Sequence, residues 1–143
     1  MRALTVAFLG LLVYSASTLA SKCSVPADVY FDSGSRDISD MQKERINRPI
    51  DRVKLDNTVL AVLLVGHTDS LEVPRERQSQ LSLDRANAVA EYVISTYPEL
   101  KAVVHVEGKG ALQPLSYKDV SPNRRVDIEV ICIVQGPFGI PKK

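Results

Sequence analysis

The sequence has little net charge and few cysteines. Its 18 basic and 17 acidic residues leave a formal net charge of +1 over 143 residues. Chains that bind nucleic acid or an anionic membrane through charge usually carry a clear basic excess, so we expect neither partner. The sequence also lacks internal repeats and low-complexity tracts. Its length and its 45% hydrophobic content indicate one globular domain.

The two cysteines are Cys23 and Cys132, and no histidine lies near either of them in the sequence. Two thiols are too few for a structural zinc site on their own. In an exported protein, a pair of cysteines more often forms a disulfide than a metal site. Packing of the two thiols as plain buried hydrophobes is the alternative.

Residues 1–20 have the order of a secretory signal peptide. Arg2 is followed by an apolar run over 4–14 and by small residues up to Ala20, so we expect cleavage after Ala20. One alternative is an uncleaved anchor, but the apolar stretch is shorter than the ~20 residues of a typical span. Lipidation of Cys23 is another, although Lys22 stands where lipoproteins carry a small residue. The mature domain then covers 21–135, and 136–143 form a flexible tail.

Two helices are predicted between short strands. The first helix follows Ser39, which forms a capping box with Gln42, and Pro49 is expected to kink it or to divide it in two. The second has Ser82 as its N-cap, and Pro98 ends it. Its apolar residues recur with the period of an amphipathic helix.

Four strands are predicted, over 28–32, 59–65, 102–107 and 125–134. The apolar run 59–65 is expected to be buried on both faces. In the last strand, apolar residues alternate with Arg125, Asp127 and Glu129. The order strand, helix, strand, helix, strand, strand predicts an α+β fold. Its first three strands run parallel because helices connect them, and its last strand can run antiparallel.

Several chemical interpretations of the polar residues are open. His67 and Asp69, with His105, could bind a metal, although their spacing matches no zinc motif. A serine hydrolase is disfavoured, because no Gly-x-Ser-x-Gly turn is present. Gly108-Lys109-Gly110 is a turn and not a phosphate loop, because neither Ser nor Thr follows the lysine in the required pattern.

Four short motifs follow one another along the chain. They are Gly66-His67-Thr68-Asp69, Leu81-Ser82-Leu83-Asp84-Arg85-Ala86, Gly108-Lys109-Gly110 with Pro114, and Asn123-Arg124-Arg125-Val126. Together they resemble the signature of the OmpA C-terminal-like family, which includes the domains of OmpA, MotB and Pal. The resemblance covers roughly residues 28–132, which is nearly the whole mature chain.

The resemblance implies a β-α-β-α-β-β fold with a mixed four-stranded sheet, whose last strand lies antiparallel beside the first. It also implies a periplasmic protein that binds peptidoglycan non-covalently through the diaminopimelate of the stem peptide, with no cofactor and no catalysis. Association with the outer membrane fits this location. The alternative is an interaction subunit of an envelope protein complex that keeps the fold but binds a protein partner.

The resemblance assigns diaminopimelate to Asp69 and Arg85, with support from Thr68, Leu81, Asn123 and Arg124. The end of diaminopimelate carries an ammonium, from which an aspartate can accept a hydrogen bond, and a carboxylate, which an arginine can bind with two parallel hydrogen bonds. We expect both side chains to be largely exposed, with Arg85 in the first turn of its helix beside free main-chain N–H groups. A surface Asp69–Arg85 ion pair is the alternative interpretation.

Three features depart from the family pattern. Gln78 stands where members usually have Asn, Ala111 replaces a common Glu, and the loop from Asp69 to Leu81 is one residue longer and richer in charge. In the implied fold, Cys23 precedes the first strand and Cys132 lies near the end of its antiparallel neighbour. A Cys23–Cys132 disulfide is therefore expected.

Overall fold

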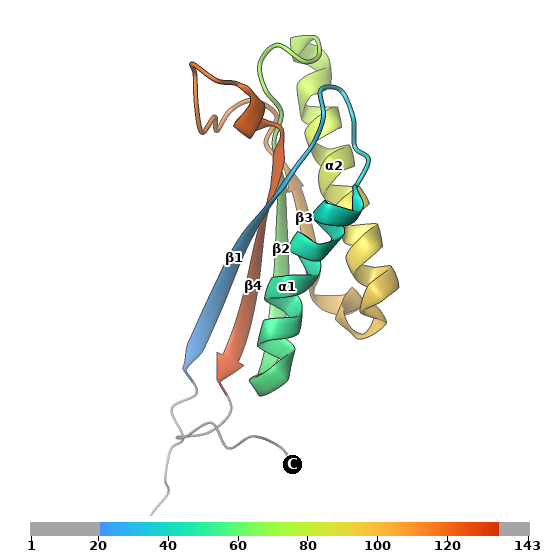
Figure 1. Ribbon diagram of the computed structural model, residues 1–143, viewed down its shortest axis with the longest axis vertical. Coiled ribbons are helices and arrows are strands. Elements are labelled where there is room, and N and C mark those ends of the chain that lie inside the picture. Colours follow the sequence, from blue (N-terminus) through green and yellow to red (C-terminus); the bar gives the residue numbers. More distant parts are fainter. Residues whose placement is uncertain (1–20, 135–143) are drawn as a thin grey trace, which may run out of the picture.

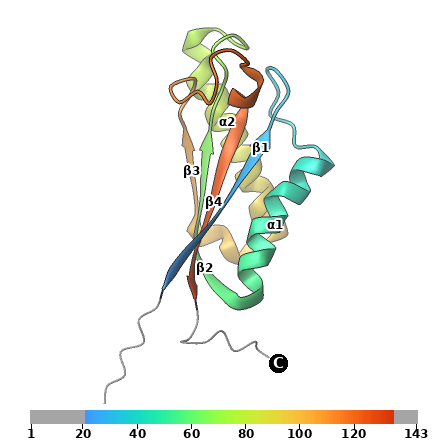
Figure 2. The ribbon, with the colours of Figure 1, turned by 60° about the vertical axis from the view of Figure 1, so that its left-hand side comes forward.

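The computed structural model describes residues 21–134. It contains a four-stranded mixed sheet with two α-helices on one of its faces (Figures 1 and 2). This is the α+β architecture that the sequence predicts. The predicted signal peptide and the tail 136–143 lie outside the described residues. None of the described helices is long and apolar enough to cross a membrane.

The four strands are arranged in the order β1-β4-β2-β3. They comprise β1 (Lys22–Tyr30), β2 (Asn57–Gly66), β3 (Val104–Gly108) and β4 (Arg125–Val134). β2 and β3 pair in parallel, whereas β4 runs antiparallel to both β1 and β2. The expectation that the last strand lies antiparallel beside the first is therefore confirmed.

The strand β4 has the bounds that the sequence predicts, and its alternating apolar residues are buried in the core. The strand β1 begins six residues earlier than predicted, since it pairs with β4 from Lys22 to Tyr30. The expectation that the apolar run of β2 is buried on both faces is wrong. Val62 and Leu64 are buried, but Leu63 and Val65 are only partly covered, because both helices lie on one face of the sheet (Figure 2).

The helix α1 (Asp40–Asp56) begins after Ser39, whose hydroxyl accepts a hydrogen bond from the Gln42 N–H, which is one of the two bonds of the predicted capping box. The side chain of Gln42 accepts the N–H of Tyr30. The expectation that Pro49 divides this segment into two short helices is wrong, since one α-helix continues through it. A proline inside a helix costs ~3 kcal/mol. Burial of Ile46, Ile50 and Val53 against the sheet offsets this cost, at about 1.5–3 kcal/mol for each apolar side chain.

The helix α2 (Arg75–Thr96) begins eight residues earlier than predicted, and the assignment of Ser82 as its N-cap is wrong. The chain enters the helix at Pro74, and the intervening segment Arg-Glu-Arg-Gln-Ser-Gln-Leu consists mostly of good helix formers. A short 3₁₀-helix (Pro98–Val103) follows α2 and occupies the first two residues of the predicted third strand.

Ser82 instead marks the place where α2 packs against the sheet. A Cβ on Gly66 would lie 1.8 Å from the carbonyl oxygen of Ser82, and one on Gly108 would lie 2.8 Å from the N atom of Leu83. The hydroxyl of Ser82 accepts a hydrogen bond of 2.9 Å from the N–H of Gly110. Because these glycines let the helix approach the ends of β2 and β3, Arg85 is brought over the same end of the sheet.

Cys23 and Cys132 form a disulfide, as expected, with a Cα–Cα distance of 4.9 Å. They are directly paired residues of β1 and β4. The bond joins the beginning of β1 to the end of β4, which is the end of the sheet opposite Arg125 and Gly66.

Candidate functional site

Three loops meet at the end of the sheet where β1, β2 and β3 finish (Figures 1 and 2). They follow β1 over 31–39, follow β2 over 67–74, and connect β3 to β4 over 109–124. The motifs that resemble the family signature lie in these loops and in the adjacent part of α2. This end of the sheet is therefore the candidate site.

Arg85 lies at the centre of this end and is fully buried. It donates five hydrogen bonds, three of which go to the backbone carbonyls of Asp32, Ser35 and His67. The other two go to the carboxylate of Glu72, at 2.7 and 2.6 Å, in a paired arrangement. Every N–H donor of the guanidinium is therefore in use.

The carboxylate of Glu72 is also fully buried. Besides the two bonds from Arg85, it accepts the N–H of Asp69 at 3.0 Å and the N–H of Gly34 at 2.9 Å. We call these four donors, from Arg85, Asp69 and Gly34, the carboxylate cradle. A guanidinium fork with two backbone amides is a strong, geometrically specific binding site for one carboxylate.

Asp69 follows β2 and is 2% exposed. Its Oδ1 atom accepts the N–H groups of Leu71 and Glu72 at 2.6 and 2.7 Å, which folds the loop into a tight turn. Its Oδ2 atom accepts a hydrogen bond of 3.0 Å from Arg124. Since an ionised carboxylate offers about four acceptor positions, one remains for a further donor.

Two expectations about this pair are wrong. Asp69 and Arg85 are buried rather than exposed, and Arg85 lies ten residues inside α2 rather than in its first turn beside free N–H groups. The alternative of a direct Asp69–Arg85 ion pair is also wrong, because Asp69 pairs with Arg124 and Arg85 pairs with Glu72. The two residues nevertheless share a partner, since the N–H of Asp69 and the guanidinium of Arg85 both donate to Glu72 Oε1.

Of the supporting residues predicted from the sequence, Thr68 and Arg124 lie beside Asp69. Thr68 is 1% exposed, and its hydroxyl makes no hydrogen bond to any described residue. It lines a cavity of about 80 Å³ together with Ser70 and Asn123. An unpaired buried hydroxyl costs free energy, so a ligand group that forms a hydrogen bond with Thr68 would be favoured. The cavity has room for a small polar group.

Asn123 and Leu81 have other positions. The amide of Asn123 accepts the N–H groups of Leu115 and Ser116 and donates to the Ser116 carbonyl, so it folds the loop between β3 and β4. Leu81 is a half-buried residue of α2. Asn123 lines the cavity beside Thr68, whereas Leu81 contributes no polar group.

Besides the pairs Arg85–Glu72 and Asp69–Arg124, this end of the sheet holds an ion pair of Arg125 with Asp127. His67 is buried with its Nε2 atom 3.0 Å from Asp127, and Arg125 also contacts Asp127. Burial alone would raise the pKa of the Asp127 carboxyl, but its contacts with His67 and Arg125 outweigh burial and hold the pKa below its ordinary value. Asp127 therefore neutralises the charge of Arg125. The neighbouring arginine, Arg124, is the one that contacts Asp69.

The metal alternative gains no support within residues 21–134, where no three His, Cys, Asp or Glu side chains are grouped closely enough to hold an ion. His105 is an exposed residue of β3. His67 is engaged with Asp127, while Asp69 is engaged with Arg124.

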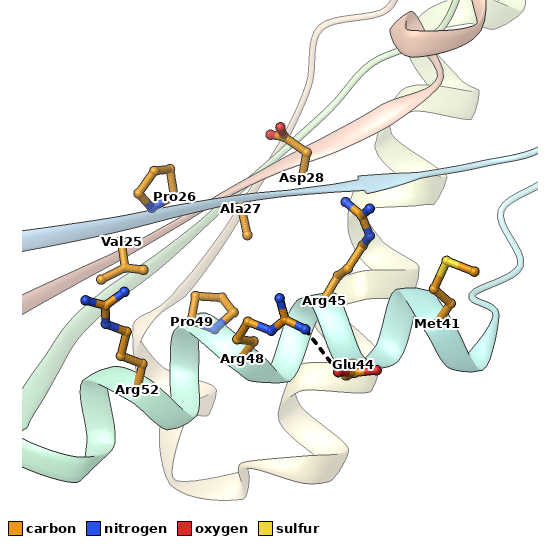
Figure 3. A pocket seen from close by; sticks show the side chains of 10 residues that line it. All are labelled: Val25, Pro26, Ala27, Asp28, Met41, Glu44, Arg45, Arg48, Pro49 and Arg52. Atoms are coloured by element: carbon orange, nitrogen blue, oxygen red, sulfur yellow. Dashed lines mark hydrogen bonds and ion pairs between the residues drawn. The ribbon is translucent and has the colours of Figure 1, made fainter.

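A larger groove of about 490 Å³ lies elsewhere, between β1 and α1 (Figure 3). Arg45, Arg48 and Arg52 extend along it from α1 (Figure 3). Arg48 pairs with Glu44 at 3.1 Å, and Arg45 lies over the ring of Tyr30. Because these arginines are exposed and two of them are already engaged, the groove is a weaker candidate than the buried cradle.

Glu72 is the site residue that sequence reasoning missed. The sequence indicated a longer, charged loop between Asp69 and Leu81, but it did not single out one acid as the partner of Arg85. The signal that could have found it is an acidic residue three positions after Asp69, which a turn capped by the Asp69 carboxylate brings back over the strand end. Gln78, the departure from the family pattern, donates to the carbonyl of Ser70 in the same loop.

Comparison with known proteins gives one family. Residues 30–127 match the model of the OmpA family. A search of curated protein sequences gives no significant match. Among solved structures, the chain is similar to the OmpA-like domain of FopA1 from Francisella tularensis, with 21% identity and a TM-score of 0.65, over 80% of this chain and 76% of that chain.

Two further structures come from different envelope systems. The peptidoglycan-associated lipoprotein of Burkholderia pseudomallei has 23% identity and a TM-score of 0.60, over 73% of this chain and 89% of that chain. The cell wall anchor of the T6SS of Pseudomonas aeruginosa has 23% identity and a TM-score of 0.61, over 79% and 87%. The fold resembles these structures and the family model matches most of the described residues, so this chain belongs to the OmpA family.

Proposed function

We propose that this protein binds peptidoglycan non-covalently in the periplasm, through the diaminopimelate of the stem peptide. The observation that carries the proposal is the carboxylate cradle of Arg85, Asp69 and Gly34, which lies directly beside the Asp69 carboxylate. A carboxylate site next to an anionic acceptor suits a group that bears both a carboxylate and an ammonium. The end of diaminopimelate is such a group.

The ligand's carboxylate would take the place of the Glu72 carboxylate on Arg85 and on the two backbone amides. Its ammonium would donate to Asp69, which retains an acceptor position beside Arg124. Thr68 lines the adjoining cavity, and its unpaired hydroxyl can accept a second hydrogen bond from the ammonium. In this arrangement each polar group of the ligand has a partner, as a desolvated zwitterion requires.

Membership of the OmpA family and the similarity to two wall-associated proteins, a peptidoglycan-associated lipoprotein and a cell wall anchor, support this assignment. The work required is binding and not catalysis, so the proposal needs no nucleophile, general base or cofactor. Because the wall is a polymer, weak individual contacts can add up over many sites or within an assembly.

An alternative function is that of an interaction subunit in an envelope complex. The observation that favours it is that the cradle is already filled by a residue of the chain itself. A protein partner would then bind another surface, and the buried charges would serve the fold alone.

The variant Asp69→Asn tests the proposal. We expect it to weaken co-sedimentation with diaminopimelate-containing walls by about ten- to a hundredfold, because a hydrogen bond to a charged group contributes ~1.5–3 kcal/mol. The amide oxygen can still accept the N–H groups of Leu71 and Glu72, so the loop should keep its turn.

The matched control is Asp37→Asn, which removes the same charge from an exposed position in the loop after β1. It should bind walls like the wild type. Circular dichroism shows whether each variant is folded. Full binding by a folded Asp69→Asn protein would place the site elsewhere and favour the interaction subunit.

A further inference from the structure

We infer that Glu72 is an internal latch: its carboxylate occupies the cradle in the free protein, and a wall ligand must displace it to bind. The inference rests on the proposed function of the same site. It adds that the site is self-inhibited and that its affinity is set by the competition between Glu72 and the ligand.

The first observation is that the cradle has no spare capacity. All N–H donors of Arg85 are satisfied, and the two that would bind a ligand's carboxylate both contact Glu72. The backbone amides of Asp69 and Gly34 also donate to Glu72. A second carboxylate cannot share these four donors, so binding and the Glu72 contact exclude each other.

The second observation concerns the loop that carries Glu72. It runs over the surface between β2 and α2, and Leu71 beside Glu72 is 79% exposed. Apart from the Glu72 carboxylate, its side-chain ties are few: Asp69 accepts the N–H groups of Leu71 and Glu72, and Gln78 donates to the carbonyls of Ser70 and Val73. The loop can therefore swing outward without opening the core under the helices.

The third observation is that only one half of a zwitterionic ligand competes with Glu72. A carboxylate competes with the Glu72 side chain for Arg85. An ammonium can use the remaining acceptor position of Asp69 and leave the bond from the Glu72 N–H in place. A ligand with both groups therefore displaces the Glu72 carboxylate, whereas a ligand with an ammonium alone does not.

The decisive variant is Glu72→Gln, which keeps the shape of the side chain and removes its charge. We expect it to bind a synthetic stem tripeptide ending in meso-diaminopimelate at least about tenfold more tightly than the wild type, because a competing group within the same chain acts at an effective concentration of about millimolar or above. The affinity for the same tripeptide ending in lysine should change little. Titration calorimetry measures both.

Glu76→Gln is the matched control. It removes an identical charge from an exposed position in the first turn of α2, and its affinity should equal that of the wild type. Glu72→Ala is a second variant that removes the competing carboxylate from the cradle, and it should also bind the diaminopimelate tripeptide more tightly than the wild type. Thermal unfolding of each variant confirms that the titrated protein is folded.

A measurement on the wild type avoids any folding defect of the variants. The carbon NMR signal of the Glu72 carboxyl should shift when the diaminopimelate tripeptide saturates the protein, together with the amide signals of Gly34 and Asp69. If the tripeptide binds while the Glu72 signal stays in place, or if Glu72→Gln binds no more tightly, the latch is wrong and the proposed function stands. If wild type, Glu72→Gln and Glu72→Ala all fail to bind, the proposed function is wrong and the latch with it.

Discussion

Replacement of Arg85 by alanine should lower the free energy of unfolding by about 3–5 kcal/mol, the usual cost of leaving one charge of a buried pair without its partner. Both Arg85 and Glu72 are fully buried, so the remaining carboxylate would have no solvent to compensate it. The backbone carbonyls of Asp32, Ser35 and His67 would lose a donor as well. Urea unfolding followed by circular dichroism measures the loss. Wall binding should disappear with the guanidinium.

Arg48→Ala is the matched control for this effect. Arg48 forms an ion pair with Glu44 on the exposed side of α1, where such a pair contributes at most about 1 kcal/mol. A double variant, Arg85→Ala with Glu72→Ala, should recover part of the lost stability because no charge is left unpaired. If the Arg85→Ala variant were as stable as the Arg48→Ala variant, the predicted contribution of the buried Arg85–Glu72 pair to stability would be wrong.

Reduction of the disulfide should produce an effect of similar size. The bond closes a loop across a sequence separation of 109 residues, and the chain-entropy model assigns up to ~4–5 kcal/mol to a loop of about this length. Cys132 is fully buried and Cys23 packs against the core, so their reduced thiols would still fill the same space. Urea unfolding with and without a thiol reductant gives the difference directly.

The control is a Cys23→Ala, Cys132→Ala double variant, whose stability should not respond to the reductant. Thiol titration of the unfolded protein without reductant should find no free thiol among Cys23 and Cys132. Two reactive thiols, or an equal response of the wild type and the double variant to the reductant, would contradict the role of the bond.

The sequence was most informative where local pattern and motif agreed. The alternation in Arg125–Val134 predicted β4 to the residue, because a strand that is buried on one face imposes that period. The glycines of the motifs are explained by close packing, since Gly66 and Gly108 leave room for the backbone of Ser82 and Leu83. These features depend on neighbours that the motifs themselves contain.

Helix bounds were less predictable, because tertiary packing decided them. Ser82 is a residue type that favours the N-cap position, yet it lies inside α2 and its hydroxyl accepts a hydrogen bond from the N–H of Gly110. Pro49 predicted a break, yet burial of the α1 apolar stripe carries the helix through it. In both cases a long-range contact outweighed a local preference, which no single stretch of sequence reveals.

The sequence could not predict which charged residues pair with each other, because long-range contacts decide the pairing. Asp69 and Arg85 were recognised as members of one site, but their partners, Arg124 and Glu72, are fixed by how the loops fold over the end of the sheet. The burial of Asp69 and Arg85 depends on the same loop contacts. The expectation of two exposed side chains failed because the loop between β2 and α2 covers them.

In the proposed function, the cradle recognises the extra carboxylate of diaminopimelate. The most direct test is co-sedimentation of the wild-type protein with two purified walls, one containing meso-diaminopimelate and one containing lysine at the same position of the stem peptide. We expect the protein to pellet with the diaminopimelate wall and to remain largely in solution with the lysine wall, since lysine offers no carboxylate to replace that of Glu72 on Arg85. Equal binding to both walls, or binding to neither, would contradict the account.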